Sequence, residues 1–172
     1  MALPYQEGEF FLLPLDHGTY AVGLTARVPS RGGVLLGYFF GPRRLEAPTD
    51  PNYLRQLRAE HAVICCRFKD AALYRGEWKV IGASDPFERA RWPVPPFHRF
   101  DGSGTTVPGT QAITDWRVEY GDDNLIVPVR EVAASQEDMT LADDTAFDPR
   151  LLSMEVSRRL TIEMPGSDAW KR

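Results

Sequence analysis

Thiol and imidazole groups are the side chains of this sequence that could act as nucleophiles, bases or metal ligands. The two cysteines, Cys65 and Cys66, are adjacent, and the three histidines are His17, His61 and His98. A thiol beside a histidine could attack a substrate, and four such groups could hold zinc. The histidines lack HxH or HxxxH spacing, and the thiols lie in an apolar run where burial keeps a thiol protonated. The pattern predicts two free cysteines, no metal site, no catalytic residue and no cofactor.

A pair of adjacent carboxylates is the second group that could do chemistry. Asp122 and Asp123 belong to the sequence YGDD at residues 120–123, which is similar to the turn that holds Mg²⁺ ions in polymerase palm domains. A palm enzyme needs a further metal-binding Asp on a neighbouring strand and a chain several times longer. Gly and Asp are also ordinary residues of hairpin turns. We therefore expect a structural turn here.

Arginines and aromatic residues alternate between residues 87 and 100. They could stack on single-stranded nucleic acid, cover an apolar surface with their stems, or anchor a protein partner, because such residues dominate binding hot spots. Prolines at 93, 95 and 96 disfavour a helix or a central strand. We expect an extended segment lying across a sheet. The residues concerned are Phe87, Arg89, Arg91, Trp92, Phe97, Arg99 and Phe100.

The net charge of −4 is unevenly distributed along the chain. The window from Glu119 to Asp148 contains nine acidic residues and one basic residue, Arg130. This charge disfavours binding to a phosphate backbone, so nucleic acid is not an expected partner. It would suit a basic protein, because opposite charges steer association, or it could be a solvated loop region.

Short strands are the main elements expected to position these residues. Tyr20, Val22, Leu24 and Ala26 alternate with residues of the other face, as in a strand, and a glycine turn at residues 16–18 makes a hairpin with the preceding apolar run. We expect strands at 9–15, 19–28, 34–40, 61–68, 77–81, 113–120 and 125–132. The glycine-rich stretch 101–110 lacks the phosphate-binding pattern GxxxxGK[ST] and is expected to be a loop.

Two helices are expected, each opened by an Asp-Pro pair that supplies an N-cap and a proline at the first helical position. The first covers 51–59 and the second 149–164. Leu152, Val156 and Leu160 in the second helix recur every four residues and form one apolar stripe.

The length of 172 residues fits one domain. We expect a β-rich core over 7–132, an acidic loop over 133–148 and the C-terminal helix over 149–164. This balance favours the α+β class, with a curved, mostly antiparallel sheet that forms a small barrel or half-barrel. The sequence has no apolar run of about 18 residues and no visible signal peptide, so a cytoplasmic protein without a membrane partner is expected.

Two segments together resemble the immunity protein 26 family of bacterial polymorphic toxin systems. The first is GEFFLLPLDHGTYAVG at 8–23, and the second is GEWKVIGASDPFERARWPVPPF at 76–97. Glu9 stands where the family usually has Asp, and Lys79 stands where Pro is usual. The resemblance covers roughly residues 7–100, with the hairpin at 116–130 as a further candidate, and it leaves out the acidic segment and the C-terminal helix.

The resemblance implies an intracellular antitoxin that binds one cognate toxin stoichiometrically and needs no active site. Immunity proteins against nucleases often mimic the charge of the substrate, so a basic toxin such as a nuclease would suit the acidic window. We expect the partner to contact Phe87, Arg89, Arg91, Trp92, Phe97, Arg99, Asp122, Asp123, Asp143 and Asp144.

Two other functions remain open from the sequence. One is a β-barrel adaptor that binds a protein unrelated to toxins. The other is a small enzyme with a dispersed site, which would require a deep polar pocket with clustered titratable groups. No pattern in the sequence predicts an oligomeric state.

Overall fold

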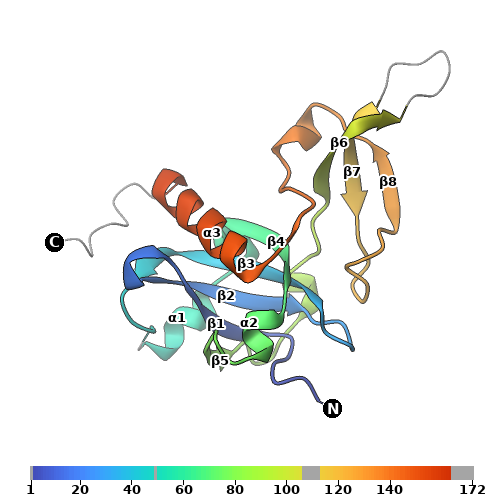
Figure 1. Cartoon of the computed structure of the whole chain (residues 1–172). Helices are drawn as coiled ribbons and strands as arrows, with labels where there is room; N and C mark the ends of the chain where they lie inside the picture. The colour runs from blue at the N-terminus through green and yellow to red at the C-terminus, as the bar shows by residue number, and fades with distance from the viewer. Residues whose placement is uncertain (1, 49, 106–112, 164–172) are drawn as a thin grey trace.

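The computed structural model of the chain describes residues 2–48, 50–105 and 113–163. Its main sheet has six strands in the order β5-β1-β2-β3-β4-β9, and a second sheet has three strands in the order β6-β7-β8 (Figure 1). The main-sheet strands are β1 (Glu9–Pro14), β2 (Tyr20–Arg27), β3 (Val34–Arg44), β4 (Ile64–Lys69), β5 (Val80–Ala83) and β9 (Ala146–Phe147). The second sheet consists of β6 (Phe97–Thr105), β7 (Ile113–Glu119) and β8 (Arg130–Ala133).

Three α-helices and four short 3-10 helices accompany the sheets in the described residues. The α-helices are α1 (Pro51–Gln56), α2 (Ala71–Tyr74) and α3 (Pro149–Glu163). The 3-10 helices are η1 (Asp16–Gly18), η2 (Ala59–His61), η3 (Arg89–Arg91) and η4 (Glu137–Thr140). Asp50 caps α1 by accepting a hydrogen bond from the Asn52 amide at 2.8 Å, as the Asp-Pro pair predicts.

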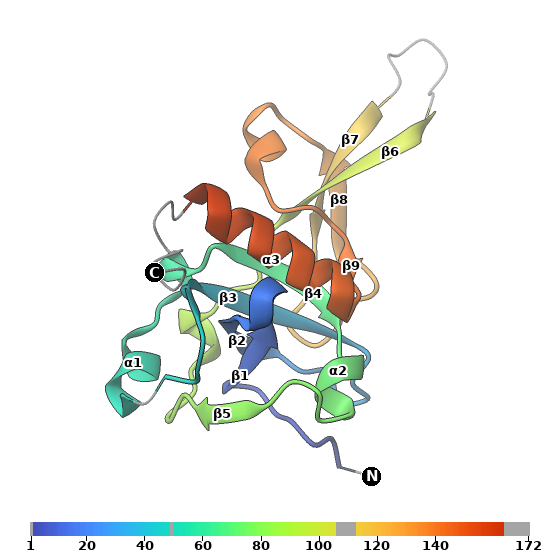
Figure 2. The ribbon, with the colours of Figure 1, turned by 60° about the vertical axis from the view of Figure 1, so that its left-hand side comes forward.

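The main sheet buries both of its faces. Consecutive strand residues point to opposite sides, so Phe10 and Phe11 of β1 enter different apolar cores. One core lies under α3, which crosses this face of the sheet in both ribbon views (Figures 1 and 2). Leu152, Val156 and Leu160 are fully buried there, which confirms the predicted stripe.

Aromatic stacking organises the core beneath α3. The ring of Phe11 lies parallel to the indole of Trp78, with centroids 5.3 Å apart. Phe11 also lies directly over Gly23, where an added Cβ would stand 2.4 Å from a ring atom. Glycine is therefore required at this position of β2, because any side chain there would clash with the Phe11 ring on the neighbouring strand β1.

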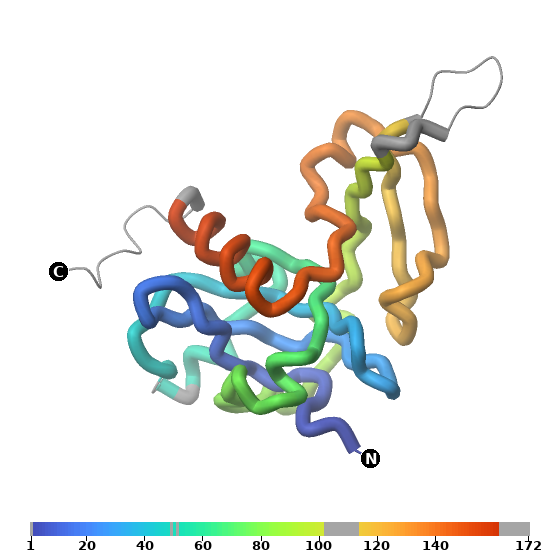
Figure 3. Tube along the Cα trace, in the orientation of Figure 1, coloured from blue at the N-terminus to red at the C-terminus, as the bar shows by residue number. Residues whose placement is uncertain are grey.

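The opposite face of the main sheet is covered by the aromatic segment and by the second sheet. Trp92 packs edge-on against Tyr38 and Phe40 of β3. Phe97 packs against Tyr120 in the same core. The second sheet extends beyond the main sheet at one end, and the loop between β7 and β8 turns back towards the β2–β3 turn (Figure 3).

The α+β class and the curved, mostly antiparallel sheet are confirmed. The main sheet has two free ends, β5 and β9, so it is open and does not close into a barrel. The only parallel pairing among the described strands joins β4 to β9.

Several predicted boundaries are wrong. Residues 101–105 belong to strand β6, whose pairing with β7 is interrupted after Phe100 and resumes where Thr105 lies opposite Ile113; residues 106–110 of that expected loop lie outside the described residues. The strand expected at 77–81 begins only at Val80, and the one expected at 125–132 begins only at Arg130. The stretch expected to be an acidic loop contains η4 and β9.

Candidate functional site

Three buried arginines of the main sheet hold later parts of the chain. Arg27 of β2, Arg43 of β3 and Arg67 of β4 have exposed fractions of only 2%, 7% and 7%. A buried charge is costly unless it is paired and hydrogen-bonded. Each guanidinium has a carboxylate partner, which for Arg43 is the earlier Asp16, and each also hydrogen-bonds to a segment at least 77 residues later in sequence.

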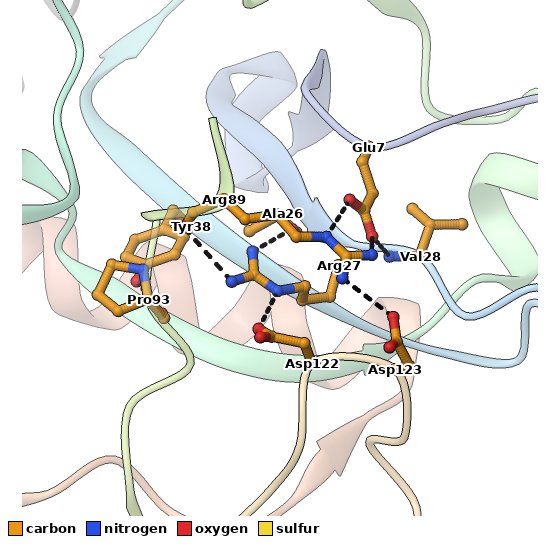
Figure 4. Close-up of polar contacts among 9 residues, drawn as sticks. All are labelled: Glu7, Ala26, Arg27, Val28, Tyr38, Arg89, Pro93, Asp122 and Asp123. Carbon is orange, nitrogen blue, oxygen red and sulfur yellow. Dashed lines mark hydrogen bonds and ion pairs between the residues drawn. The ribbon is translucent and has the colours of Figure 1, made fainter. Parts of the chain in front are cut away.

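Arg27 fixes the start of the loop between β7 and β8, which we call the 121–129 loop. Its Nε donates to Asp122 Oδ1 at 2.5 Å, and its Nη1 donates to the Ala26 carbonyl at 2.7 Å. Arg89 of η3 lies beside it and bridges Glu7 at 2.7 Å and Asp123 at 3.0 Å (Figure 4). The carboxylates of Glu7 and Asp123 therefore hold the pKa of Arg89 above its ordinary value.

The Arg27 and Arg89 cluster borders a hollow of about 490 Å³ between the main sheet and the 121–129 loop. Its lining includes Pro93, Val94 and Tyr120 as well as the two arginines and Asp122. The Tyr38 hydroxyl donates to the Pro93 carbonyl at the same place (Figure 4). This hollow brings together the two regions from which the sequence predicted partner contacts.

Arg67 fixes the end of the acidic segment and the middle of the 121–129 loop. Its guanidinium donates to the Leu125 carbonyl, to the Asp144 carbonyl and to Asp144 Oδ1, each at 2.7 Å. The guanidinium also lies over the Tyr120 ring, 4.1 Å from its centroid. Burial raises the pKa of Asp144 despite Arg67, and burial together with the Asp144 hydrogen bond raises the pKa of Tyr120 to about 12.

Arg43 attaches helix α3 to the sheet. It pairs with Asp16, and its Nη2 donates to Ser157 Oγ at 2.6 Å and to Thr161 Oγ1 at 3.0 Å. Burial raises the pKa of Asp16, but hydrogen bonds from Arg43 and Ser157 outweigh it, so the pKa lies below its ordinary value. A hollow of about 560 Å³ adjoins this contact.

Among the described residues, His98 and the two cysteines do not bring a nucleophile together with a base. His98 Nε2 lies 2.8 Å from Asp115 Oδ1, beside a hollow of about 390 Å³. The hydroxyl lining that hollow, Thr145, donates to Asp143 and not to His98. Burial raises the pKa of Cys65 to about 12 and that of Cys66 well above its ordinary value. The described part of the chain contains no group of three or more His, Cys, Asp or Glu side chains placed to bind a metal ion.

The residues predicted to contact a partner differ in how far the structure exposes them. Trp92 and Phe97 are 2% and 0% exposed, because both pack into the core; as placed, they support the surface from within. Phe87 is half-buried against the same core. On the surface lie Arg89 and Arg91 of η3, Asp122 and Asp123 of the 121–129 loop, and Asp143. Arg99 and Asp144 meet at 3.7 Å elsewhere in the protein.

Arg27, Arg43 and Arg67 were absent from the predicted site. Arg67 carries one recognisable signal, a cation in the otherwise apolar run ICCRF. Such a residue in a buried strand requires a carboxylate or carbonyl partner. The sequence does not indicate which acid supplies it.

A model of immunity protein 26 (Imm26) matches residues 6–107, which is more than half of the chain. The chain belongs to this family. The match contains both the 8–23 and 76–97 segments and confirms the resemblance on which the sequence interpretation rested. Comparisons with curated proteins and with solved structures gave no match. None of the described helices is long and apolar enough to cross a membrane.

Proposed function

We propose that the protein neutralises a cognate bacterial toxin by binding it stoichiometrically, without catalysis, in the cytoplasm. The observation that carries this proposal is the match to the immunity protein family over residues 6–107. The geometry is consistent with it, since the carboxylates of the site pair with arginines of the same protein. A binding protein needs a stable scaffold and a surface, and this chain has both.

We further propose that the surface around Arg89, Arg91, Asp122 and Asp123 meets the toxin. Asp123 has an exposed side-chain fraction of 85% and Arg89 one of 42%. Arg91 is exposed and has no ion pair with any residue in the described ranges. Arg89 and Asp122 line the hollow of about 490 Å³, and Asp123 pairs with Arg89. This surface thus combines charges of both signs, which gives specificity for one complementary partner.

The structure weakens the hypothesis that the acidic window at residues 119–148 imitates the charge of a nucleic acid. Six of its nine carboxylates stand within 4.0 Å of an arginine. Asp148 instead accepts the amides of Arg150 and Leu151 at the start of α3. Most of the negative charge is therefore engaged within the protein. A basic toxin remains the proposed partner, but nuclease activity has less support than the charge count alone suggests.

Co-expression tests the proposal. The product of the adjacent upstream gene is produced in a host with and without the full chain, and growth is measured. Rescue of growth, together with 1:1 binding in isothermal titration, is the expected result. If no neighbouring gene product is bound or neutralised, the proposal is wrong, and an adaptor role becomes the better explanation.

A further inference from the structure

The 121–129 loop displays three apolar side chains to solvent. Ile126, Val127 and Val129 are 65%, 60% and 69% exposed. Other large exposed hydrophobic residues in the described part of the chain, such as Leu45 and Phe100, occur singly in sequence. Single exposed apolar residues are normal, whereas a contiguous group indicates a contact surface. We call Ile126, Val127 and Val129 the apolar ridge.

The backbone that carries the ridge is held in place from both ends. Asn124 Oδ1 accepts the amides of Ile126 at 3.0 Å and Val127 at 3.1 Å. The Val129 amide donates to the Glu119 carbonyl at 2.8 Å. Leu125, between the turn and the ridge, is fully buried. A surface fixed in this way loses little conformational entropy when it binds a partner.

Buried charge contributes to the same rigidity. Arg67 holds the Leu125 carbonyl and Arg27 holds Asp122, so two buried guanidinium groups of the main sheet determine where the ridge stands. The loop thus exposes apolar side chains to solvent, and it is held in place by hydrogen bonds from two buried arginines.

The surroundings of the ridge identify the chemistry of its partner. Asp122 and Asp123 lie at the start of the loop with exposed side-chain fractions of 54% and 85%. A hollow of about 200 Å³ separates Ile126 and Asp123 from the β2–β3 turn at Pro29–Gly32. Arg31 of this turn also lines the hollow, so charges of both signs, from Asp123 and Arg31, stand beside Ile126.

The ridge continues the surface proposed to meet the toxin, because Asp123 borders the hollow beside Ile126 and also pairs with Arg89. Charges of both signs therefore stand beside the ridge. A toxin with an apolar pocket bordered by charges of both signs would complement this part of the surface. A second copy of this chain is the alternative that the test distinguishes.

We infer that the apolar ridge is the central contact with the toxin and inserts into an apolar pocket whose rim carries charges of both signs. This inference rests on the proposed function and adds to it the part of the surface that supplies most of the affinity. Arg89, Arg91 and Asp123 then form the polar rim of the interface, which contributes more to association rate and specificity than to affinity.

The test replaces the ridge by threonines, which keep the β-branched shape but remove apolar surface. Ile126→Thr, Val127→Thr and Val129→Thr are combined in the full chain, with Val127→Thr alone as a milder variant. Val80→Thr and Leu45→Thr are the matched controls, since both residues are exposed at 37% and 55% but lie elsewhere. Binding of the product of the adjacent upstream gene is measured by isothermal titration, with thermal unfolding of each variant alongside.

The triple variant should bind at least about 30-fold more weakly, because central apolar contacts dominate interface energies. Val127→Thr should weaken binding about threefold or more, and the two controls should bind like the wild type. Asp123→Asn should mainly reduce the salt dependence of association.

Each other outcome counts against a defined part of the inference. If the wild type binds and the triple variant, folded, binds equally well, the ridge is not the contact and the proposed function stands. If Val127→Thr remains folded and binds like the wild type while the triple variant unfolds, the ridge is again excluded. If the wild type does not bind, the proposed function and this inference fall together. If the wild type sediments as a dimer that the triple variant abolishes, the occupant is a second copy and not the toxin.

Discussion

The two sheets of this protein are stabilised by different balances of forces. The main sheet has apolar cores on both faces, with α3 over one and the aromatic segment over the other. The second sheet contributes a small apolar patch through Phe97, Val118 and Tyr120, and its connecting segments are additionally held by buried arginines. Apolar contacts tolerate many sequences of suitable size, whereas a buried ion pair depends on both partners. The attachment of the second sheet should therefore respond more specifically to single substitutions.

The largest effect is expected in the main sheet. Phe11→Ala removes the ring that stacks on Trp78 and covers Gly23, and it should lower the free energy of unfolding by about 3–5 kcal/mol. Urea unfolding measures the loss. Phe100→Ala, at a residue 68% exposed, is the control and should change stability by less than about 0.5 kcal/mol. Equal losses for both variants would mean that the main core is not the principal source of stability.

The second effect is expected at the junction of the sheets. Arg67→Met leaves the Asp144 side chain, which is 3% exposed, without its main partner and should cost about 3 kcal/mol. Amide hydrogen exchange should accelerate in β7 and in the 121–129 loop more than in β2. Combining Arg67→Met with Asp144→Asn should cost less than the sum of the two single changes. Additive losses, or uniform acceleration of exchange, would show that the pair does not hold the second sheet.

A smaller effect separates two neighbouring aspartates. Asp122→Asn removes the charge that faces buried Arg27 and should cost about 1.5–3 kcal/mol, the range for a hydrogen bond to a charged group. Asp123→Asn breaks an exposed pair with Arg89 and should cost less than about 1 kcal/mol. Thermal unfolding of both variants at one protein concentration makes the comparison. If Asp123→Asn lost more stability than Asp122→Asn, the role given to Arg27 would be contradicted.

The smallest effect concerns pH. Hydrogen bonds from the Ser135 amide and hydroxyl, and then from Arg117, hold the pKa of Asp138 below its ordinary value. Because the folded-state pKa lies below the unfolded value of about 3.9, this carboxylate stabilises the fold fully above that value and loses its contribution as the pH falls through the folded-state pKa. Asp138→Asn should therefore be less stable than the wild type near neutrality, and the difference should shrink in acid. A constant difference between pH 7 and pH 3 would rule this out.

The alternation of apolar residues made the main sheet predictable. Val22, Leu24 and Ala26 enter one core as expected, and Leu152, Val156 and Leu160 enter the other. Two of the three Asp-Pro pairs also mark the start of a helix, since α1 begins at Pro51 and α3 at Pro149, whereas Asp85-Pro86 does not. These features are local, because strand and helix periods and N-caps depend on residues that lie within a few positions of one another.

The candidate site was predictable only in part, because its contacts join distant segments. Arg27 and Asp122 are 95 residues apart, and Arg43 and Ser157 are 114 residues apart. Composition indicated that residues 119–148 are acidic but not that most of these acids face arginines. It also placed Trp92 and Phe97 among the exposed anchors, where aromatic character alone does not distinguish a contact residue from a core residue.

The position of α3 has a consequence for how the protein is made. The helix that covers one face of the main sheet is among the last described residues to leave the ribosome, while β1 to β4 emerge first. Until then, Phe11, Phe39 and Phe68 lack their cover, and β4 lacks its neighbour β9. Nascent chains with uncovered apolar faces and open strand edges are prone to aggregate. A chain shortened to the segment that matches the family would remain in that state permanently, so the cover of this face of the main sheet depends on a part of the sequence outside the family match.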